Sequence, residues 1–131
     1  MEESLQAANK KPMPSIPKTP DLEDVRAICK LLEDHKGGDV TALDLRELHL
    51  WTDFFVIATV TSSTQLQGLL RHITEFADTE GLLIQRRTGR EESGGWSLVD
   101  MGTAVIHLMT APSREFYELE GLWSSAVKIY P

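Results

Sequence analysis

The stretch GGWSLVDMGTAVIHLMTAPSREFYELEGLW, residues Gly94–Trp123, decides the fold of this chain. It opens with two apolar runs of strand length, Trp96–Met101 and Thr103–Thr110, which are joined through Met101 and Gly102. A glycine at the second central position suits the tight turn of a hairpin. The sequence therefore predicts an antiparallel hairpin that turns at Met101 and Gly102.

The predicted hairpin has two largely apolar faces. In this register Trp96 is expected opposite His107, Leu98 opposite Val105, and Asp100 opposite Thr103. Side chains alternate across a strand, so one face carries Ser97, Val99, Ala104, Ile106 and Leu108. The other face carries Trp96, Leu98, Asp100, Thr103, Val105, His107 and Met109. A small domain usually covers only one such face with its own helices, so the face with Trp96 and His107 is the candidate contact surface.

Length and composition restrict the class of protein. A chain of 131 residues predicts one domain with a single modest core. The formal charge of -7, without a large Lys/Arg cluster, argues against a nucleic-acid binder. Cys29 is the chain's single cysteine, so no internal disulfide can form, which fits a reducing compartment. No apolar run approaches the roughly 20 residues that span a bilayer, and the first residues lack a secretory apolar region. We therefore expect no membrane partner and a cytoplasmic location.

The N-terminal half predicts a tail, a helix and a strand. Residues 1–18 contain several prolines among polar residues and are expected to form a flexible tail. Thr19 is expected to cap a helix whose apolar stripe is Leu22, Val25, Ile28, Cys29 and Leu32, with Cys29 as a small core residue. Residues 39–46 then read as a strand. Trp51, in the connector that follows, is expected to cover the core.

The middle of the chain predicts a strand, a helix and a strand. Phe54–Thr61 is almost continuously apolar, as in a central strand covered on both faces. Ser62 and Gln65 form a capping box at the start of a helix that ends at Gly81. Leu82–Arg87 is the next expected strand, and a strand–helix–strand run of this length favours a parallel crossover.

The C-terminal part predicts a short helix after the hairpin. This helix is expected to start near Pro112 and to bury a stripe of Phe116, Leu119, Leu122 and Trp123. Residues 124–131 are expected to form a C-terminal tail, although Ile129 and Tyr130 could dock. The domain therefore spans residues 19–123. Its predicted class is mixed α/β, with a mixed sheet of about five strands and helices packed on it.

No catalytic, metal or cofactor constellation is apparent in the sequence. His35, His49, His72 and His107 are scattered, without the helical spacing that would bring two ligands together. Phosphate-cradling loops need spaced glycines between a strand and a helix, and none is found in that setting. We therefore expect a protein that is not an enzyme, with no catalytic residue and no cofactor.

Several segments, taken in order, carry a resemblance to a known family. They are LDLREL and TDFFVIAT within residues 43–59, TSSTQ at 61–65, GREESGGWSLVDMGTAVIHLMT at 89–110, and SREFYELEGLW at 113–123. Together they resemble the ribosomal silencing factor family, also called Iojap. The resemblance covers roughly residues 21–123, and it is specific because several motifs occur in the family's order.

This resemblance implies a small α/β domain shaped like a nucleotidyltransferase but without its chemistry. Such factors bind the large ribosomal subunit through its ribosomal protein fourteen, block small-subunit joining sterically and repress translation. By resemblance and by the exposed hairpin face, the expected partner-binding residues are Trp96, Leu98, Asp100, Val105, His107, Arg114 and Tyr117. Phe116 and Leu119 are expected in the core, and little direct RNA contact is expected.

Three alternatives stay open from the sequence. One is a nucleotide-binding or nucleotidyltransferase-type enzyme, although the Gly-Ser pair and the D-x-D acids of that class are absent. Another is a factor for large-subunit assembly, the role of organelle relatives. A homodimer that hides the same hairpin face is the third, and it is compatible with ribosome binding if dimer and ribosome compete.

Overall fold

The computed structural model describes residues 18–88, 95–122 and 124–131. The expected N-terminal tail lies outside the described residues except for Lys18. That residue already belongs to the domain, since its N–H donates to the carbonyl of Gly81 and its carbonyl accepts from Leu83 N, both at 3.1 Å.

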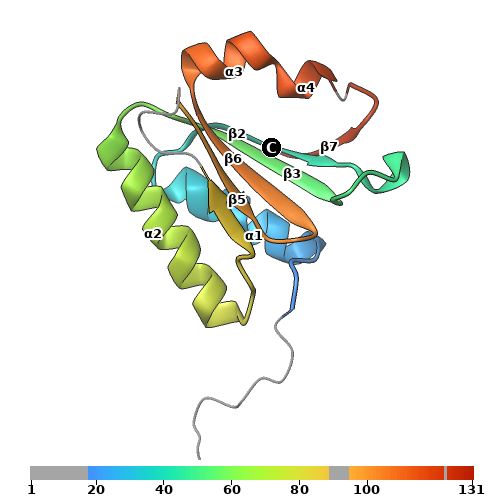
Figure 1. Ribbon diagram of the computed structural model, residues 1–131, viewed down its shortest axis with the longest axis horizontal. Helices are drawn as coiled ribbons and strands as arrows, with labels where there is room; N and C mark the ends of the chain where they lie inside the picture. The colour runs from blue at the N-terminus through green and yellow to red at the C-terminus, as the bar shows by residue number, and fades with distance from the viewer. Residues whose placement is uncertain (1–17, 89–94, 123) are drawn as a thin grey trace, which may run out of the picture.

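A single mixed sheet forms the centre of the molecule, with strand order β4-β5-β6-β3-β2-β7 (Figure 1). β3 and β6 pair in parallel, and the other neighbours in the sheet are antiparallel. The strands are β2 (Gly38–Asp44), β3 (Phe54–Val60), β4 (Arg86–Thr88), β5 (Trp96–Asp100), β6 (Ala104–Thr110) and β7 (Val127–Tyr130). The mixed α/β class is therefore confirmed, with six strands in the sheet rather than about five.

The helices lie on opposite sides of this sheet. Figure 1 shows α1 (Leu22–Asp34) and α2 (Ser63–Glu80) together on one side, with α3 (Ala111–Tyr117) and α4 (Leu119–Leu122) on the other. A short 3-10 turn, η1 (Arg46–Leu48), follows β2. The two long helices and the two short ones therefore close the two faces of the sheet very differently.

Each long helix begins at a polar cap. Asp21, not the predicted Thr19, caps α1, because its side chain accepts from Asp24 N while the Asp24 carboxylate accepts from Asp21 N. Ser62 caps α2 as predicted, accepting from Gln65 N at 3.0 Å. The Gln65 side chain accepts from Thr61 N instead of closing the box on Ser62.

The hairpin keeps its predicted faces but not its predicted register. Trp96 pairs with Met109, Leu98 with His107 and Asp100 with Val105, a shift of two residues. The turn therefore centres on Gly102 and Thr103, and Gly102 has a φ of 87°, a conformation that favours glycine. Thr103 Oγ1 donates to the carbonyl of Pro20 at 2.6 Å, which ties this turn to the chain just before α1.

Two apolar clusters fill the two sides of the sheet. The first, beneath α1 and α2, includes Ile28, Leu32, Leu69, Ile73, Val56, Ile106 and Leu108. Cys29 lies fully buried in it, and burial raises the pKa of the thiol to about 12. The second, beneath α3 and α4, includes Leu43, Leu45, Phe55, Ile57, Val105, Met109 and Leu119. β3 and β6 contribute to both clusters, which confirms that Phe54–Val60 is covered on both faces.

Two expectations about strands are corrected. Residues 124–131 were expected to form a tail, but Val127–Tyr130 form β7, which pairs antiparallel with β2. The hydroxyl of Tyr130 also donates to Glu33 of α1. The strand expected at Leu82–Arg87 is observed as β4, which is shorter and begins later, at Arg86. It lies at the edge of the sheet opposite β7. Its direction matches that of β3, although β6 and β5 lie between them.

Candidate functional site

Aromatic rings form a continuous row across the face of the sheet that α3 and α4 partly cover. We call it the aromatic row, and its members in order are Trp51, Phe55, His107, Trp96, Tyr117 and Phe116. Neighbouring ring centroids along the row are 6.0, 4.5, 5.9, 4.6 and 4.9 Å apart. These spacings match those of packed aromatic pairs. The row links the connector after β2 to β3, β6, β5 and α3.

The middle of the aromatic row is buried and its two ends are exposed. Phe55 and His107 are only 2% and 5% exposed, whereas Trp51 is 69%, Phe116 78% and Tyr117 46% exposed. Large exposed aromatics that adjoin a buried cluster are typical of surfaces that bind another macromolecule. The expectation that Phe116 lies in the core is therefore wrong, and Trp51, which was expected to cover the core, contacts Phe55 but is largely exposed.

His107 holds the central tryptophan in place. Its Nδ1 accepts a hydrogen bond from Trp96 Nε1 at 3.1 Å, and its Nε2 finds no partner among the described residues. Burial lowers the pKa of His107 to about 4, so the ring is neutral near pH 7. A neutral ring that accepts at Nδ1 carries its proton on Nε2. His107 thus orients the Trp96 indole from below and offers almost no surface of its own.

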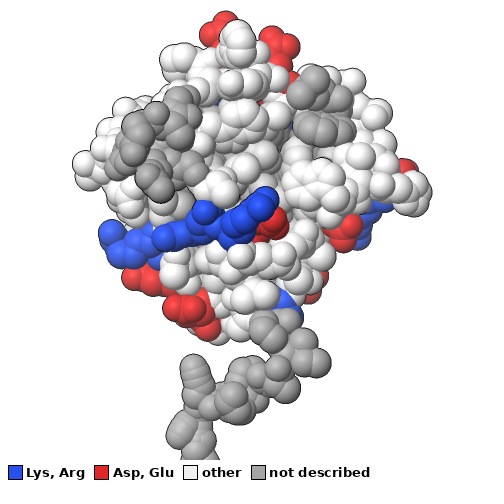
Figure 2. All heavy atoms as spheres, in the orientation of Figure 1, with Lys and Arg blue, Asp and Glu red and all other residues white. Residues whose placement is uncertain are grey.

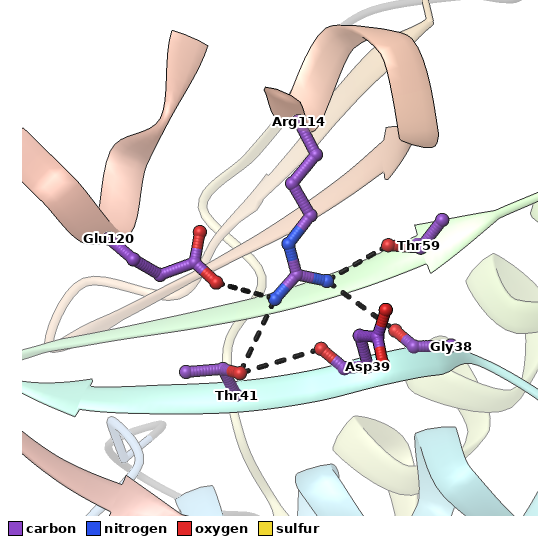
Figure 3. Close-up of polar contacts among 6 residues, drawn as sticks. All are labelled: Gly38, Asp39, Thr41, Thr59, Arg114 and Glu120. Atoms are coloured by element: carbon purple, nitrogen blue, oxygen red, sulfur yellow. Dashed lines mark hydrogen bonds and ion pairs between the residues drawn. The ribbon is translucent and has the colours of Figure 1, made fainter. Parts of the chain in front are cut away.

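Arg114 fastens α3 and α4 to the sheet (Figure 3). Its guanidinium donates to Glu120 Oε2 at 2.7 Å, Thr59 Oγ1 at 2.9 Å, Thr41 Oγ1 at 3.3 Å and the carbonyl of Gly38 at 3.5 Å. Burial opposes ionisation of Glu120, but the hydrogen bond and charge of Arg114 outweigh it and lower the pKa of that carboxyl. Arg114 is therefore a clamp under α3, which carries Tyr117 and Phe116.

The predicted site residues lie in three different settings. Trp96 and Leu98 are half-buried against the second cluster, and Tyr117 is exposed and packs on the Trp96 ring. Val105 and His107 lie beneath them, 2% and 5% exposed. Asp100 shapes the hairpin turn, since its Oδ1 accepts from Gly102 N at 2.9 Å.

Sequence reasoning missed Trp51 and Phe116 as surface residues. The connector containing Trp51 did carry a signal, because it is too apolar for an ordinary solvated loop. For Phe116 the signal was misleading. Glu118 adopts a left-handed conformation with a φ of 47°, which separates α3 from α4 and breaks the helical periodicity that joined Phe116 to Leu119.

The described residues offer little to a metal or a nucleotide. No group of three or more His, Cys, Asp or Glu side chains among them converges as a metal site would. A small hollow lies where β3 and β6 end beside the start of α2, and its lining includes Val60, Leu66, Trp96 and Leu108. No acidic side chain of the described residues lines it, so this part of the chain supplies none of the carboxylates that hold Mg²⁺ for nucleotidyl transfer. Among residues 18–88, 95–122 and 124–131, no helix has the length and apolarity needed to cross a membrane.

The fold and site thus define a small mixed α/β domain whose distinctive surface is aromatic. The chain belongs to the ribosomal silencing factor family, since the family profile described as "Ribosomal silencing factor during starvation" matches residues 18–130. This match includes β7, in agreement with the corrected C-terminal boundary.

Relatives and a solved structure agree with this membership. The chain is 35% identical over 105 residues to the ribosomal silencing factor RsfS of Bacillus subtilis, covering 80% of this chain and 86% of that protein. It is 33% identical over 102 residues to chloroplastic protein Iojap of Arabidopsis thaliana, covering 78% of this chain and 42% of that one. A crystal structure of a Chromobacterium violaceum protein, 31% identical, superposes with a TM-score of 0.71 over 80% of this chain and 88% of the other.

A mouse relative carries a different name. The chain is 28% identical over 112 residues to "Mitochondrial assembly of ribosomal large subunit protein 1" of Mus musculus, covering 77% of this chain and 45% of that protein. The chain thus spans less than half of both organelle relatives, whereas it spans most of the Bacillus subtilis protein.

Proposed function

We propose that this protein binds the large ribosomal subunit, blocks its association with the small subunit and so represses translation. Membership of the ribosomal silencing factor family supports the proposal. The observation that carries it is the aromatic row, with a buried middle and exposed ends at Trp51, Phe116 and Tyr117. A patch of this kind offers the apolar anchors that dominate the free energy of protein–protein binding.

The proposed contact on the ribosome is ribosomal protein fourteen of the large subunit. In this arrangement Trp96, Leu98 and Tyr117 touch the partner together with the two exposed ends of the aromatic row. Val105 and His107 support them from beneath, Asp100 holds the hairpin turn, and Arg114 keeps α3 against the sheet. The residues expected from the sequence therefore contribute in two ways, some by contact and others by positioning.

The proposed mechanism is steric and needs no reaction step. A rigid domain bound at the joining surface of one subunit excludes the other subunit by its volume. Affinity is all that this requires, so the proposal includes neither a cofactor nor an enzymatic activity. The cytoplasm, as the compartment that holds ribosomes, stays a prediction.

The experiment is sedimentation of the purified protein with separated ribosomal subunits through a gradient. We expect the protein to co-migrate with the large subunit and not with the small one. When both subunits are mixed, its addition should reduce the fraction of joined ribosomes. Trp51→Ala should weaken co-migration while leaving the unfolding midpoint nearly unchanged, because Trp51 is 69% exposed.

Leu83→Ala is a matched control for that variant. Leu83 is also an exposed apolar residue, at 42%, but it lies outside the aromatic row. Its substitution should leave co-migration intact. Absence of any co-migration of the unaltered protein at moderate salt would contradict the proposal. Equal binding by both variants would remove Trp51 from the proposed contact.

A role in large-subunit assembly is a second candidate, favoured by the name of the mouse relative. An assembly factor would use the same contact with the large subunit, but it would bind while the subunit is being assembled rather than after it is complete. Loss of the protein would then cause incomplete large subunits to accumulate during growth, whereas an anti-association factor affects finished subunits when nutrients are scarce. A homodimer through the aromatic row is compatible with both, and concentration-dependent sedimentation would reveal it.

A further inference from the structure

Three arginines gather at the β4 edge of the sheet, away from the aromatic row. Arg71 lies on α2, and Arg86 and Arg87 are consecutive in β4; all three are exposed. We call them the arginine edge. Arg71 and Arg87 line one open hollow together with Thr74 and Ile84. Figure 2 shows Lys and Arg side chains forming a band from the left side to the middle of this view, with acidic side chains at its inner end and below it.

The charge of the arginine edge is only partly balanced by the described residues around it. None of its three members makes an ion pair with a residue in 18–88, 95–122 or 124–131. Arg87 donates to the neutral Thr74 hydroxyl at 3.3 Å. Glu75 lines the same hollow, but its carboxylate lies 3.7 Å from His72 Nδ1. Asp100 lies opposite Arg86 across the β4–β5 ladder, so among the described residues three arginines face two acids and an excess of positive charge remains in a chain whose formal charge is -7.

Protection of a sheet edge does not account for this cluster. Charged side chains on an edge strand discourage pairing with another chain, which explains one or two arginines in β4. Arg71 is outside the sheet, on α2, and contributes nothing to that protection. Because Arg86 and Arg87 alternate across the strand, the cluster presents guanidinium groups on both sides of the edge. Such a spread suits a line of separate anions better than a single carboxylate.

We propose that the arginine edge binds phosphates of ribosomal RNA when the aromatic row engages the large subunit. The inference rests on the proposed function and adds a second contact to it. Guanidinium groups match phosphate oxygens in pairs, and all three cations here are arginine rather than lysine. The surface of a large subunit presents RNA phosphates beside its proteins. The expectation of little direct RNA contact is therefore revised.

The test compares two double variants in their binding to purified large subunits over a range of KCl concentrations. Arg71→Gln/Arg87→Gln removes two charges of the arginine edge. Arg26→Gln/Lys36→Gln removes two exposed charges elsewhere on the surface. Removing one arginine–phosphate interaction should reduce the slope of log affinity against log salt by about 1, so the first variant should show a reduction of about 2. The control should retain the slope of the unaltered protein.

Ultraviolet cross-linking on the same complexes identifies the partner. After nuclease digestion, nucleotide adducts are expected on the peptides that contain Arg71 or Arg86–Arg87. Equal salt slopes for both double variants, with the unaltered protein bound, would overturn the inference and leave the proposed function intact. A reduced slope without adducts on those peptides would assign an acidic protein surface and would also overturn it. Failure of the unaltered protein to bind would remove both proposals.

Discussion

The two faces of the sheet share β3 and β6 yet are closed in different ways. Helices of 13 and 18 residues cover one face, and its side chains are buried throughout the cluster. Helices of 7 and 4 residues cover the other, where the aromatic row emerges at both ends. The difference predicts that the side chains buried under α1 and α2 serve stability alone, while those of the α3/α4 face are divided between stability and the proposed binding.

Alternation along a strand makes this comparison testable residue by residue. In β6, Ile106 points into the α1/α2 cluster and its neighbour Val105 into the other. In β3, Val56 and Ile57 divide in the same way. Substitutions one position apart therefore report on different faces.

The largest expected effect is on the α1/α2 face. Ile106→Ala removes buried methyl groups from a site with no exposure and leaves a cavity. It should lower the free energy of unfolding by about 3 kcal/mol, measured by urea denaturation. The fraction that stays folded should bind large subunits normally. A loss of affinity in folded protein would show that this face is not confined to stability.

Removal of the Arg114 clamp should have the next largest effect. Arg114→Met keeps the length of the side chain but leaves Glu120 and Thr59 without its hydrogen bonds. Because the Glu120 side chain is 37% exposed, solvent screens part of the effect, and we expect about 2 kcal/mol in urea denaturation. Affinity for large subunits should fall as well, since α3 carries Tyr117 and Phe116. Arg114→Lys should restore part of the stability; unchanged stability in Arg114→Met would contradict the clamp.

A smaller, pH-dependent effect is expected from His107. Burial lowers its pKa from 6.5 to about 4, so between these values the unfolded chain binds a proton that the folded chain does not. The stability of the folded state therefore does not depend on the titration of His107 above its unfolded pKa of 6.5, and it decreases as the pH falls from 6.5 towards 4. Its slope is at most about 1.4 kcal/mol per pH unit.

The measurement is a series of urea unfolding curves between pH 7 and pH 4. His107→Phe removes the titrating group, so its free energy of unfolding should fall less steeply than that of the unaltered protein. The carboxylates titrate in both proteins and cancel in the difference. Parallel curves would mean that His107 is reached by solvent in the folded state.

The smallest expected change in stability is at Phe116, which forms one of the two exposed ends of the aromatic row. Phe116→Ser alters a side chain that is 78% exposed, so the free energy of unfolding should change by less than about 0.5 kcal/mol. Affinity for large subunits should nevertheless fall, by about 1 to 2 kcal/mol if Phe116 is an anchor. Leu83→Ser, measured by the same sedimentation, should leave affinity unchanged. Equal affinities would restrict the contact to the other end of the row.

Strand alternation and the Ser62 cap of α2 could be predicted because they depend on nearby residues, whereas the cap of α1 was predicted at Thr19, two residues before Asp21. The assignment of side chains to the two faces of the hairpin is correct although the predicted register is wrong by two residues. A shift of two leaves every side chain on the same face of the sheet. The register itself depends on distant contacts at the turn. Thr52 Oγ1 donates to the carbonyl of Gly102, and Thr103 bonds to Pro20, which no local pattern reveals.

The candidate site could be predicted only in part for a similar reason. Trp96 and Tyr117 follow from the strand pattern and the family motif. The clamp role of Arg114 requires partners on β2, β3 and α4, which are far apart in sequence. The arginine edge could not be predicted from the sequence, because Arg71 and Arg87 are 16 positions apart and lie side by side only when α2 and β4 are folded.

The burial of Cys29 makes the protein well suited to site-selective covalent labelling. It is the chain's single cysteine, it has no exposed surface, and a pKa of about 12 keeps it as the unreactive thiol. A cysteine introduced at an exposed position would therefore react alone with a maleimide dye or a photo-cross-linker. Probes placed in turn on the aromatic row and beside the arginine edge could then report each contact separately, without first removing a native thiol.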